Sequence, residues 1–228
     1  MNIYIGYDSR EDLAFQVSSF SIKSKSQEAN IVPLKLSELR EKKLYYREED
    51  KLGSTEFTFS RFLVPFLNNY EGWALFCDCD ILFLESIENL FNQVDDKYAV
   101  MCVKHDYKPK SETKMDGKLQ SLYPRKNWSS LVLWNCGHPS NKKITKELVN
   151  DSQITGKYLH RFSWLKDEEI GSVSHHWNWL VGWYQEPKDG KPKAIHYTEG
   201  GPWFADYRFC EYHAVWKDYL FKMMESNQ

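Results

Sequence analysis

The feature that most constrains the fold is an apolar run from Trp73 to Leu84 that is interrupted only by Asp78 and Asp80. The first part of the run, residues 73–77, predicts a strand buried on both faces, as in the middle of a parallel sheet. Because unpaired carboxylates are costly to bury, these flanks favour a shared partner for the two aspartates over a merely solvated turn. A divalent cation that also bridges a diphosphate is such a partner.

Short apolar segments alternate with helical patterns around this run. Strands are predicted at residues 3–6, 31–36, 73–77, 98–103, 130–134 and 194–197. Helices are predicted near residues 13–20, 59–67, 87–91 and 144–149 and in the last segment of the chain. This β–α–β rhythm predicts an α/β fold with a mostly parallel central sheet flanked by helices.

Length and charge narrow the class of protein. The 228 residues are enough for one compact domain, residues 1–228. The 30 basic and 32 acidic side chains leave a net charge of −2, which argues against a nucleic-acid partner. No apolar stretch approaches the roughly 18 residues of a membrane span, so no transmembrane segment is expected.

The cysteines and the first residues indicate in which cellular compartment the protein is expected. The five cysteines have no framework spacing and are expected to be reduced thiols. The chain shows no basic segment followed by a long apolar one, so no signal peptide is expected. Both observations favour a cytoplasmic protein.

Four segments in order carry a resemblance to a known family. They are residues 3–8, which form the first strand and turn, residues 60–65 with Arg61, the Asp78-Cys79-Asp80 element, and residues 195–203 with His196. The chain resembles GT-A fold glycosyltransferases, most closely glycosyltransferase family 8 and its bacterial relatives. The resemblance covers residues 3 to 203 and implies the GT-A nucleotide-diphospho-sugar transferase fold.

The resemblance implies a metal site. Asp78 would contact the metal and the ribose, and Asp80 and His196 would be direct metal ligands. A histidine in an oxygen-rich set suits Mn²⁺ better than Ca²⁺, with Mg²⁺ as the alternative. Taken alone, His196 would be read as a hydrogen-bonded histidine at a strand end.

The resemblance also implies nucleotide contacts. Tyr7 and Asp8 would hold the uracil and ribose, although a turn aspartate more often caps a helix. Gly200 and Gly201 would let the backbone approach phosphate. Arg61, placed with the two aspartates in the catalytic set, would touch the diphosphate or pair with a carboxylate near the site.

The implied reaction is transfer of a sugar from a nucleotide-sugar, with UDP as the expected nucleotide, to a hydroxyl with retention of configuration. The acceptor would be a glycan, a lipid-linked molecule or a small molecule. Residues 1–103 would form the nucleotide-binding half, and residues 104–228 the acceptor-side half with the C-terminal helix.

The sequence departs from the family pattern at Gly201, where a diphosphate-binding lysine would precede Pro202. Arg61, Arg125 or a lysine of the basic segment 104–126 could replace it. The departure keeps open a non-catalytic nucleotide- or glycan-binding module. Two further alternatives are a haloacid dehalogenase-like phosphohydrolase, which usually has Thr or Ser where this chain has Leu82, and a nucleotidyltransferase.

Three weaker predictions concern the sugar side. The stretch 175–179 could line an acceptor site or be core. The charge run 167–169 could hold an acceptor-side carboxylate or be solvated. Asn135, after the strand at 130–134, could face the sugar.

Overall fold

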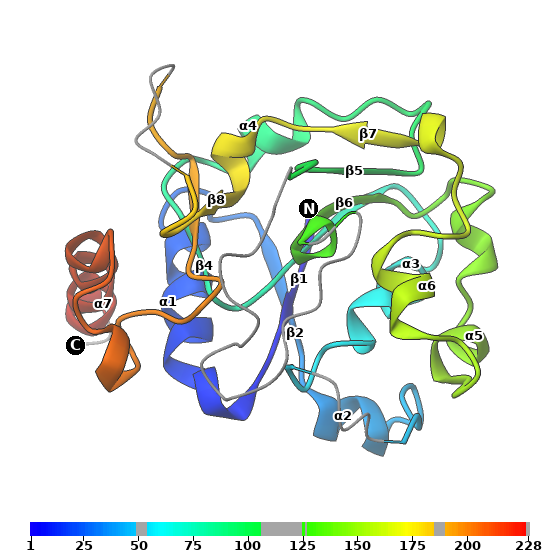
Figure 1. Ribbon diagram of the computed structural model, residues 1–228, viewed down its shortest axis with the longest axis horizontal. Helices are drawn as coiled ribbons and strands as arrows, with labels where there is room; N and C mark the ends of the chain where they lie inside the picture. The colour runs from blue at the N-terminus through cyan, green and yellow to red at the C-terminus, as the bar shows by residue number, and fades with distance from the viewer. Residues whose placement is uncertain (49–53, 106–124, 126, 185–189, 227–228) are drawn as a thin grey trace.

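The fold is built on a six-stranded sheet (Figure 1). The computed structural model describes residues 1–48, 54–105, 125, 127–184 and 190–226. In spatial order the strands are β2 (Asn30–Leu34), β1 (Asn2–Gly6), β3 (Trp73–Cys77), β6 (Leu131–Asn135), β5 (Val100–Cys102) and β7 (Ile170–Ser172).

Most neighbours in this sheet run parallel. β1 pairs in parallel with β2 and β3, and β5 pairs in parallel with β7. β6 runs antiparallel to both of its neighbours. The predicted mostly parallel sheet is therefore confirmed, and β3 has the predicted bounds. Its last four residues are buried, as the apolar run requires.

A second, three-stranded sheet has the order β4-β9-β8 and was not predicted as a sheet. Its strands are β4 (Ile81–Phe83), β9 (Ala194–His196) and β8 (Trp179–Leu180). β4 and β9 are antiparallel, and β8 and β9 are parallel. Three residues separate the end of β3 from the start of β4, so the Asp78-Cys79-Asp80 element is the connection between the two sheets.

Helices cover both sides of the large sheet. α1 and α7 lie on one side, and α3, α5 and α6 on the other (Figure 1). The α-helices are α1 (Asp12–Lys23), α2 (Leu36–Glu41), α3 (Val64–Leu67), α4 (Glu88–Phe91), α5 (Lys146–Asn150), α6 (Gly156–His160) and α7 (His213–Ser226). The 3₁₀ helices are η1 (Ser9–Glu11), η2 (Ser60–Leu63), η3 (Trp128–Ser130), η4 (Asn141–Lys143), η5 (Asp167–Glu169), η6 (His175–Asn178) and η7 (Ala205–Tyr207).

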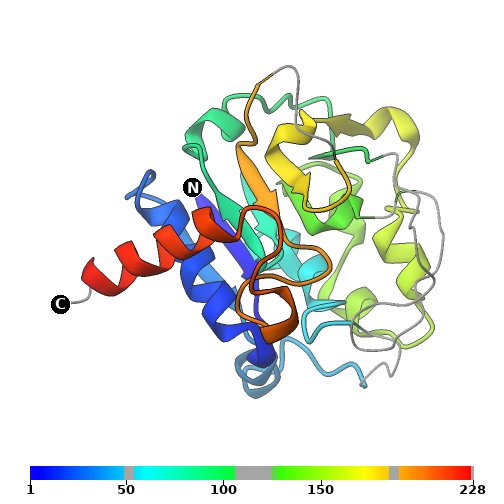
Figure 2. The same cartoon turned by 60° about the vertical axis from the view of Figure 1, so that its left-hand side comes forward.

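Two apolar clusters stabilise this arrangement. The larger surrounds the six-stranded sheet. The smaller joins α1, the small sheet and α7 through buried side chains such as Val17, Ile195 and Trp216. Figure 2 shows α7 crossing α1 at the edge of the molecule. Within the described residues, no helix has the length and apolarity that crossing a membrane requires.

Candidate metal and nucleotide site

Asp78 and Asp80 lie on either side of a buried residue. Asp78 follows the last residue of β3, and its backbone N–H donates to the Ser130 carbonyl across the β3–β6 ladder. Cys79 is 1% exposed. The chain turns at Cys79 and Asp80, and the Cys79 side chain packs inside while both carboxylates stay half-buried at the edge where the strands end.

His196 meets this pair because of the small sheet. Ile81 is the register partner of His196 across β4 and β9, and the Tyr197 N–H donates to the Asp80 carbonyl at 3.1 Å. The His196 Nε2 atom lies 3.3 Å from Asp80 Oδ1. One ligand atom each from Asp78, Asp80 and His196 all lie within 4.8 Å of one another. The three predicted metal residues are thus brought together.

A hydrogen-bond chain determines which nitrogen of His196 carries the proton. The Ser130 hydroxyl donates to the Asn127 carbonyl at 2.7 Å, so its oxygen is left to accept from Asn178 Nδ2 at 2.8 Å. Asn178 Oδ1 is then the acceptor, and His196 Nδ1–H donates to it at 2.8 Å. When the ring is neutral, Nε2 therefore presents its lone pair toward Asp80.

This arrangement fits a cation. Asp80 Oδ1 is buried and has no hydrogen-bond partner among the described residues. It lies 3.3 Å from His196 Nε2, which is an electron-pair donor in the neutral ring. A divalent ion bound to both would satisfy them, and a set of two carboxylates and one imidazole suits Mn²⁺.

Arg61 pairs with a carboxylate, which was one of its two predicted roles. Its Nη1 donates to Asp78 Oδ1 at 2.7 Å and to the Ser129 carbonyl at 3.0 Å. The side chain of Arg61 is 7% exposed and that of Asp78 is 15% exposed. This largely buried ion pair fixes one oxygen of Asp78 and orients the other.

Tyr7 and Asp8 follow β1, the neighbour of β3, at the same edge of the sheet. The Tyr7 hydroxyl donates to Asp12 Oδ1 at 2.8 Å. Asp8 is fully buried and accepts from the side chain and backbone of Arg10 and from the Glu56 N–H. Burial raises the pKa of Asp8, but these hydrogen bonds outweigh it and the pKa is lowered. Asp8 thus caps η1 and holds the segment at Glu56.

Glu11 is an acidic residue at this site that the motifs did not reveal. Burial, followed by the charges of Asp80 and Asp8, raises the pKa of Glu11 to about 8 despite the opposing effect of Arg10. Glu11 lies at the start of α1, and the charges of Asp80 and Asp78 in the metal group act on its carboxyl group. The only sequence signal was its place four residues after Tyr7.

Glycine is favoured at positions 200 and 201 for different structural reasons. Gly200 has a φ of +126°, a conformation that favours glycine. A Cβ on Gly201 would lie 2.1 Å from the indole ring of Trp203. The lysine of the family pattern therefore has no room at position 201 in this arrangement.

Of the weaker predictions, the one for Asn135 is wrong, and for the 167–169 run the structure favours the solvated alternative. Asn135 is paired with Trp73 at the start of β3, so it lies at the edge opposite Asp78, and its amide donates to the Asp96 and Tyr98 carbonyls. The 167–169 run is on η5: the Asp167 side chain is 88% exposed and pairs with Arg125. Neither position offers a side chain to the metal group. Most of the basic segment 104–126 lies outside the described residues.

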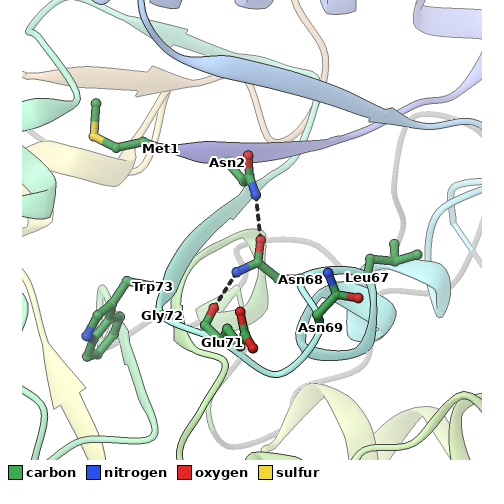
Figure 3. A pocket seen from close by; sticks show the side chains of 8 residues that line it. All are labelled: Met1, Asn2, Leu67, Asn68, Asn69, Glu71, Gly72 and Trp73. Carbon is green, nitrogen blue, oxygen red and sulfur yellow. Dashed lines mark hydrogen bonds between the residues drawn. The ribbon is translucent and has the colours of Figure 1, made fainter.

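A cavity of about 380 Å³ lies at the opposite end of the sheet from the metal group (Figure 3). It is lined by Met1, Asn2, Trp73 and residues of the turn before β3. The Asn68 amide links the Asn2 side chain to the Glu71 carbonyl across it. Since β1 and β3 begin here, the cavity is separate from the edge that carries Asp78.

Comparisons with known proteins agree with this fold. The chain is 54% identical to Protein CDI of Arabidopsis thaliana over 230 residues, 99% of this chain and 87% of the relative. No family model matches the sequence. The apo-form glycosyltransferase GlyE of Streptococcus pneumoniae TIGR4 has a TM-score of 0.64 at 14% identity, with 96% of this chain and 59% of GlyE covered. The galactosyltransferase LgtC, solved with donor and acceptor sugar analogs, has a TM-score of 0.58 at 10% identity and coverage of 96% and 95%.

These similarities to solved structures show the GT-A fold and confirm the predicted fold class. The chain spans less than two thirds of GlyE, whereas it spans nearly all of LgtC. A haloacid dehalogenase-like fold is not supported. Membership of family 8 in particular stays a prediction.

Proposed function

The chain belongs to the family of Protein CDI from Arabidopsis thaliana, and within this family we propose that it is a metal-dependent glycosyltransferase. It moves a sugar from a nucleotide-sugar, with UDP as the nucleotide, to a hydroxyl acceptor with retention of configuration. The observation that carries the proposal is the convergence of Asp78, Asp80 and His196 on a GT-A fold.

The chemistry requires charge to be stabilised on the leaving diphosphate. A Mn²⁺ ion held by Asp78, Asp80 and His196 supplies this stabilisation when bound. Arg61 holds the Asp78 carboxylate in place, and Asn178 keeps the His196 Nε2 lone pair directed at the site. These two residues act on ligand geometry and do not themselves move a proton.

The nucleotide lies along the edge where β1 and β3 end. The Tyr7 ring and the turn at Asp8 face the base and ribose, and the Gly200–Gly201 backbone approaches the diphosphate. This placement follows the general rule that open α/β sheets bind ligands beyond the carboxyl ends of their strands. A glycan, lipid-linked or small-molecule acceptor then enters from the side of the small sheet.

Replacement of Asp80 by alanine tests the proposal. Asp80→Ala should abolish Mn²⁺-dependent turnover of UDP-sugars, measured as UDP release, while the circular dichroism spectrum stays that of the wild type. Asp95→Ala, at an exposed carboxylate that pairs with Lys97, is the matched control and should retain full activity. An active Asp80→Ala enzyme would refute the metal assignment.

One observation favours a second candidate, a non-catalytic nucleotide-binding module. Gly201 replaces the diphosphate-binding lysine of the family pattern, and Trp203 occupies the space of a side chain there. This candidate predicts Mn²⁺-dependent binding of UDP without turnover of any UDP-sugar by the wild type.

A further inference from the structure

Four rings pack together beside the metal group: His105, His175, Trp179 and Tyr184. We call them the ring cluster. The centroids of Tyr184 and Trp179 are 4.9 Å apart, and those of Tyr184 and His175 are 5.6 Å apart. His105 stacks on Tyr184 with its centroid 5.9 Å away and an interplanar angle of 27°.

The ring cluster lies at the edge of the sheets that carries the metal residues. His105 comes three residues after the end of β5, which runs in the same direction as β3. Trp179 begins β8 and is the register partner of Ile195, the neighbour of His196. η6 and β8 lie directly against β9 in both views of the chain (Figures 1 and 2).

Two ring nitrogens of the cluster have unused hydrogen-bonding capacity. His105 Nε2 and Trp179 Nε1 are buried and have no hydrogen-bond partner among the described residues. The other nitrogen of His105, Nδ1, is bonded to the Tyr184 hydroxyl at 2.5 Å. An unsatisfied buried polar group costs about 1–3 kcal/mol, so native proteins keep few of them without a ligand or water.

The charge state of His105 suits a neutral polar ligand. Burial, followed by the nearby His196 and His175, lowers the pKa of His105 to about 3. The ring is therefore uncharged at neutral pH, with one nitrogen that donates and one that accepts. Such a group recognises a hydroxyl and has no charge to attract phosphate.

We infer that the ring cluster binds the ring of a hexose or pentose, with His105 Nε2 hydrogen-bonded to a sugar hydroxyl; this inference rests on the proposed function. The half-buried rings of His175 and Tyr184 provide apolar contact, and the few polar atoms of the cluster provide orientation. The sugar is either the one carried by the nucleotide or that of the acceptor. Both present the same chemistry to His105.

Two substitutions distinguish the role of the His105 Nε2 atom from that of the imidazole ring as a whole. In His105→Asn the amide takes the place of Nδ1 and keeps the bond to Tyr184, but nothing replaces Nε2. In His105→Gln the amide reaches the place of Nε2. Calorimetry with Mn²⁺ would measure the binding of UDP, and of UDP-glucose, UDP-galactose, UDP-xylose and UDP-N-acetylglucosamine. The matching free sugars would then be titrated into protein saturated with UDP and Mn²⁺.

The inference predicts that His105→Asn binds a sugar probe about tenfold more weakly, the loss expected for one hydrogen bond to a buried group. UDP alone should bind as it does to the wild type, and His105→Gln should recover most of the loss. Weakening confined to UDP-sugars assigns the subsite to the donor sugar, and weakening of free sugars assigns it to the acceptor.

Wild-type affinity of His105→Asn for every sugar probe would overturn the inference and leave the proposed function standing. An equal loss of UDP binding in both variants would also overturn it, because it would indicate a purely structural role for His105. If the wild type binds neither UDP nor any UDP-sugar in the presence of Mn²⁺, the proposed function fails and the inference fails with it.

Discussion

Asn178 orients the imidazole of His196 without itself reaching the metal group. Its amide links His196 Nδ1 to the Ser130 hydroxyl, and Ser130 also accepts the Asp78 N–H through its carbonyl. A ring of contacts thus runs from Asp78 to Asp80 through both sheets. Rigid support of this kind determines how well a metal site is formed before the metal arrives.

Asn178→Ala should weaken Mn²⁺ binding about 10–100-fold, because the His196 ring loses the acceptor that fixes its proton and its orientation. Calorimetric titration of Mn²⁺ in the presence of UDP would measure the effect. Asn92→Ala, at an exposed position after α4, is the control and should bind as the wild type does. Unchanged affinity in Asn178→Ala would show that the contact does not support the ligand.

Glu11 should destabilise the metal-free protein as pH rises. Its pKa of about 8 lies above the ordinary glutamate value, so the folded state binds the extra proton. This contribution is fully present below about pH 4.5, is lost progressively as pH rises, and is gone above about pH 8. Glu11→Gln should therefore raise the melting temperature in EDTA at pH 8 by about 2–4 °C per kcal/mol recovered, and should change little at pH 4.

Melting curves of both proteins at several pH values would measure this difference. The sign of the change in melting temperature is decisive. A Glu11→Gln variant that melts at a lower temperature than the wild type at pH 8 contradicts the raised pKa of Glu11. Equal melting temperatures throughout the pH range would mean that Glu11 is solvated.

Among the elements, those with continuous local patterns were predicted well. The strand at residues 73–77 has the observed bounds because five apolar residues in a row indicate a fully buried strand. The helix around Pro65 divides into η2 and α3, with the proline in the first turn of α3, as its missing N–H favours.

The elements that complete the site were missed for a physical reason. β8 is only two residues long and β4 only three, so neither has room for a recognisable period. The pairing of β4 with β9 also joins residues more than a hundred positions apart. The resemblance therefore indicated His196 as a ligand, but the role of Asn178 became visible only when the register of β8 and β9 was known.

The C-terminal end of α5 depends on a distant arginine. Arg47 is buried, its guanidinium lies 3.9 Å from the Phe59 ring centroid, and it donates to the Asp151 and Ile154 carbonyls at 2.6 and 2.7 Å. Arg47→Ala should lower the free energy of unfolding by about 1.5–3 kcal/mol, since these carbonyls lose a charged donor. Urea denaturation would measure the free energy of unfolding. Lys42→Ala, at an exposed position, is the control. A loss no larger than that of Lys42→Ala would contradict this role.

In the molecule as a whole, the metal group connects three parts of the chain. Asp78 directly follows β3, Asp80 directly precedes β4, and His196 is the last residue of β9. The single-domain organisation of residues 1–228, with a nucleotide half and an acceptor half, stays a prediction. The sheet nonetheless mixes the two halves, because β6 lies between β3 and β5.

Anomalous diffraction from crystals grown with UDP and Mn²⁺ would locate the metal. We expect one manganese peak at bonding distance from Asp80 and from Nε2 of His196, with Asp78 beside it and the UDP diphosphate on its open side. A manganese peak that touches none of these three residues, or UDP bound at this edge with no manganese peak, would contradict it.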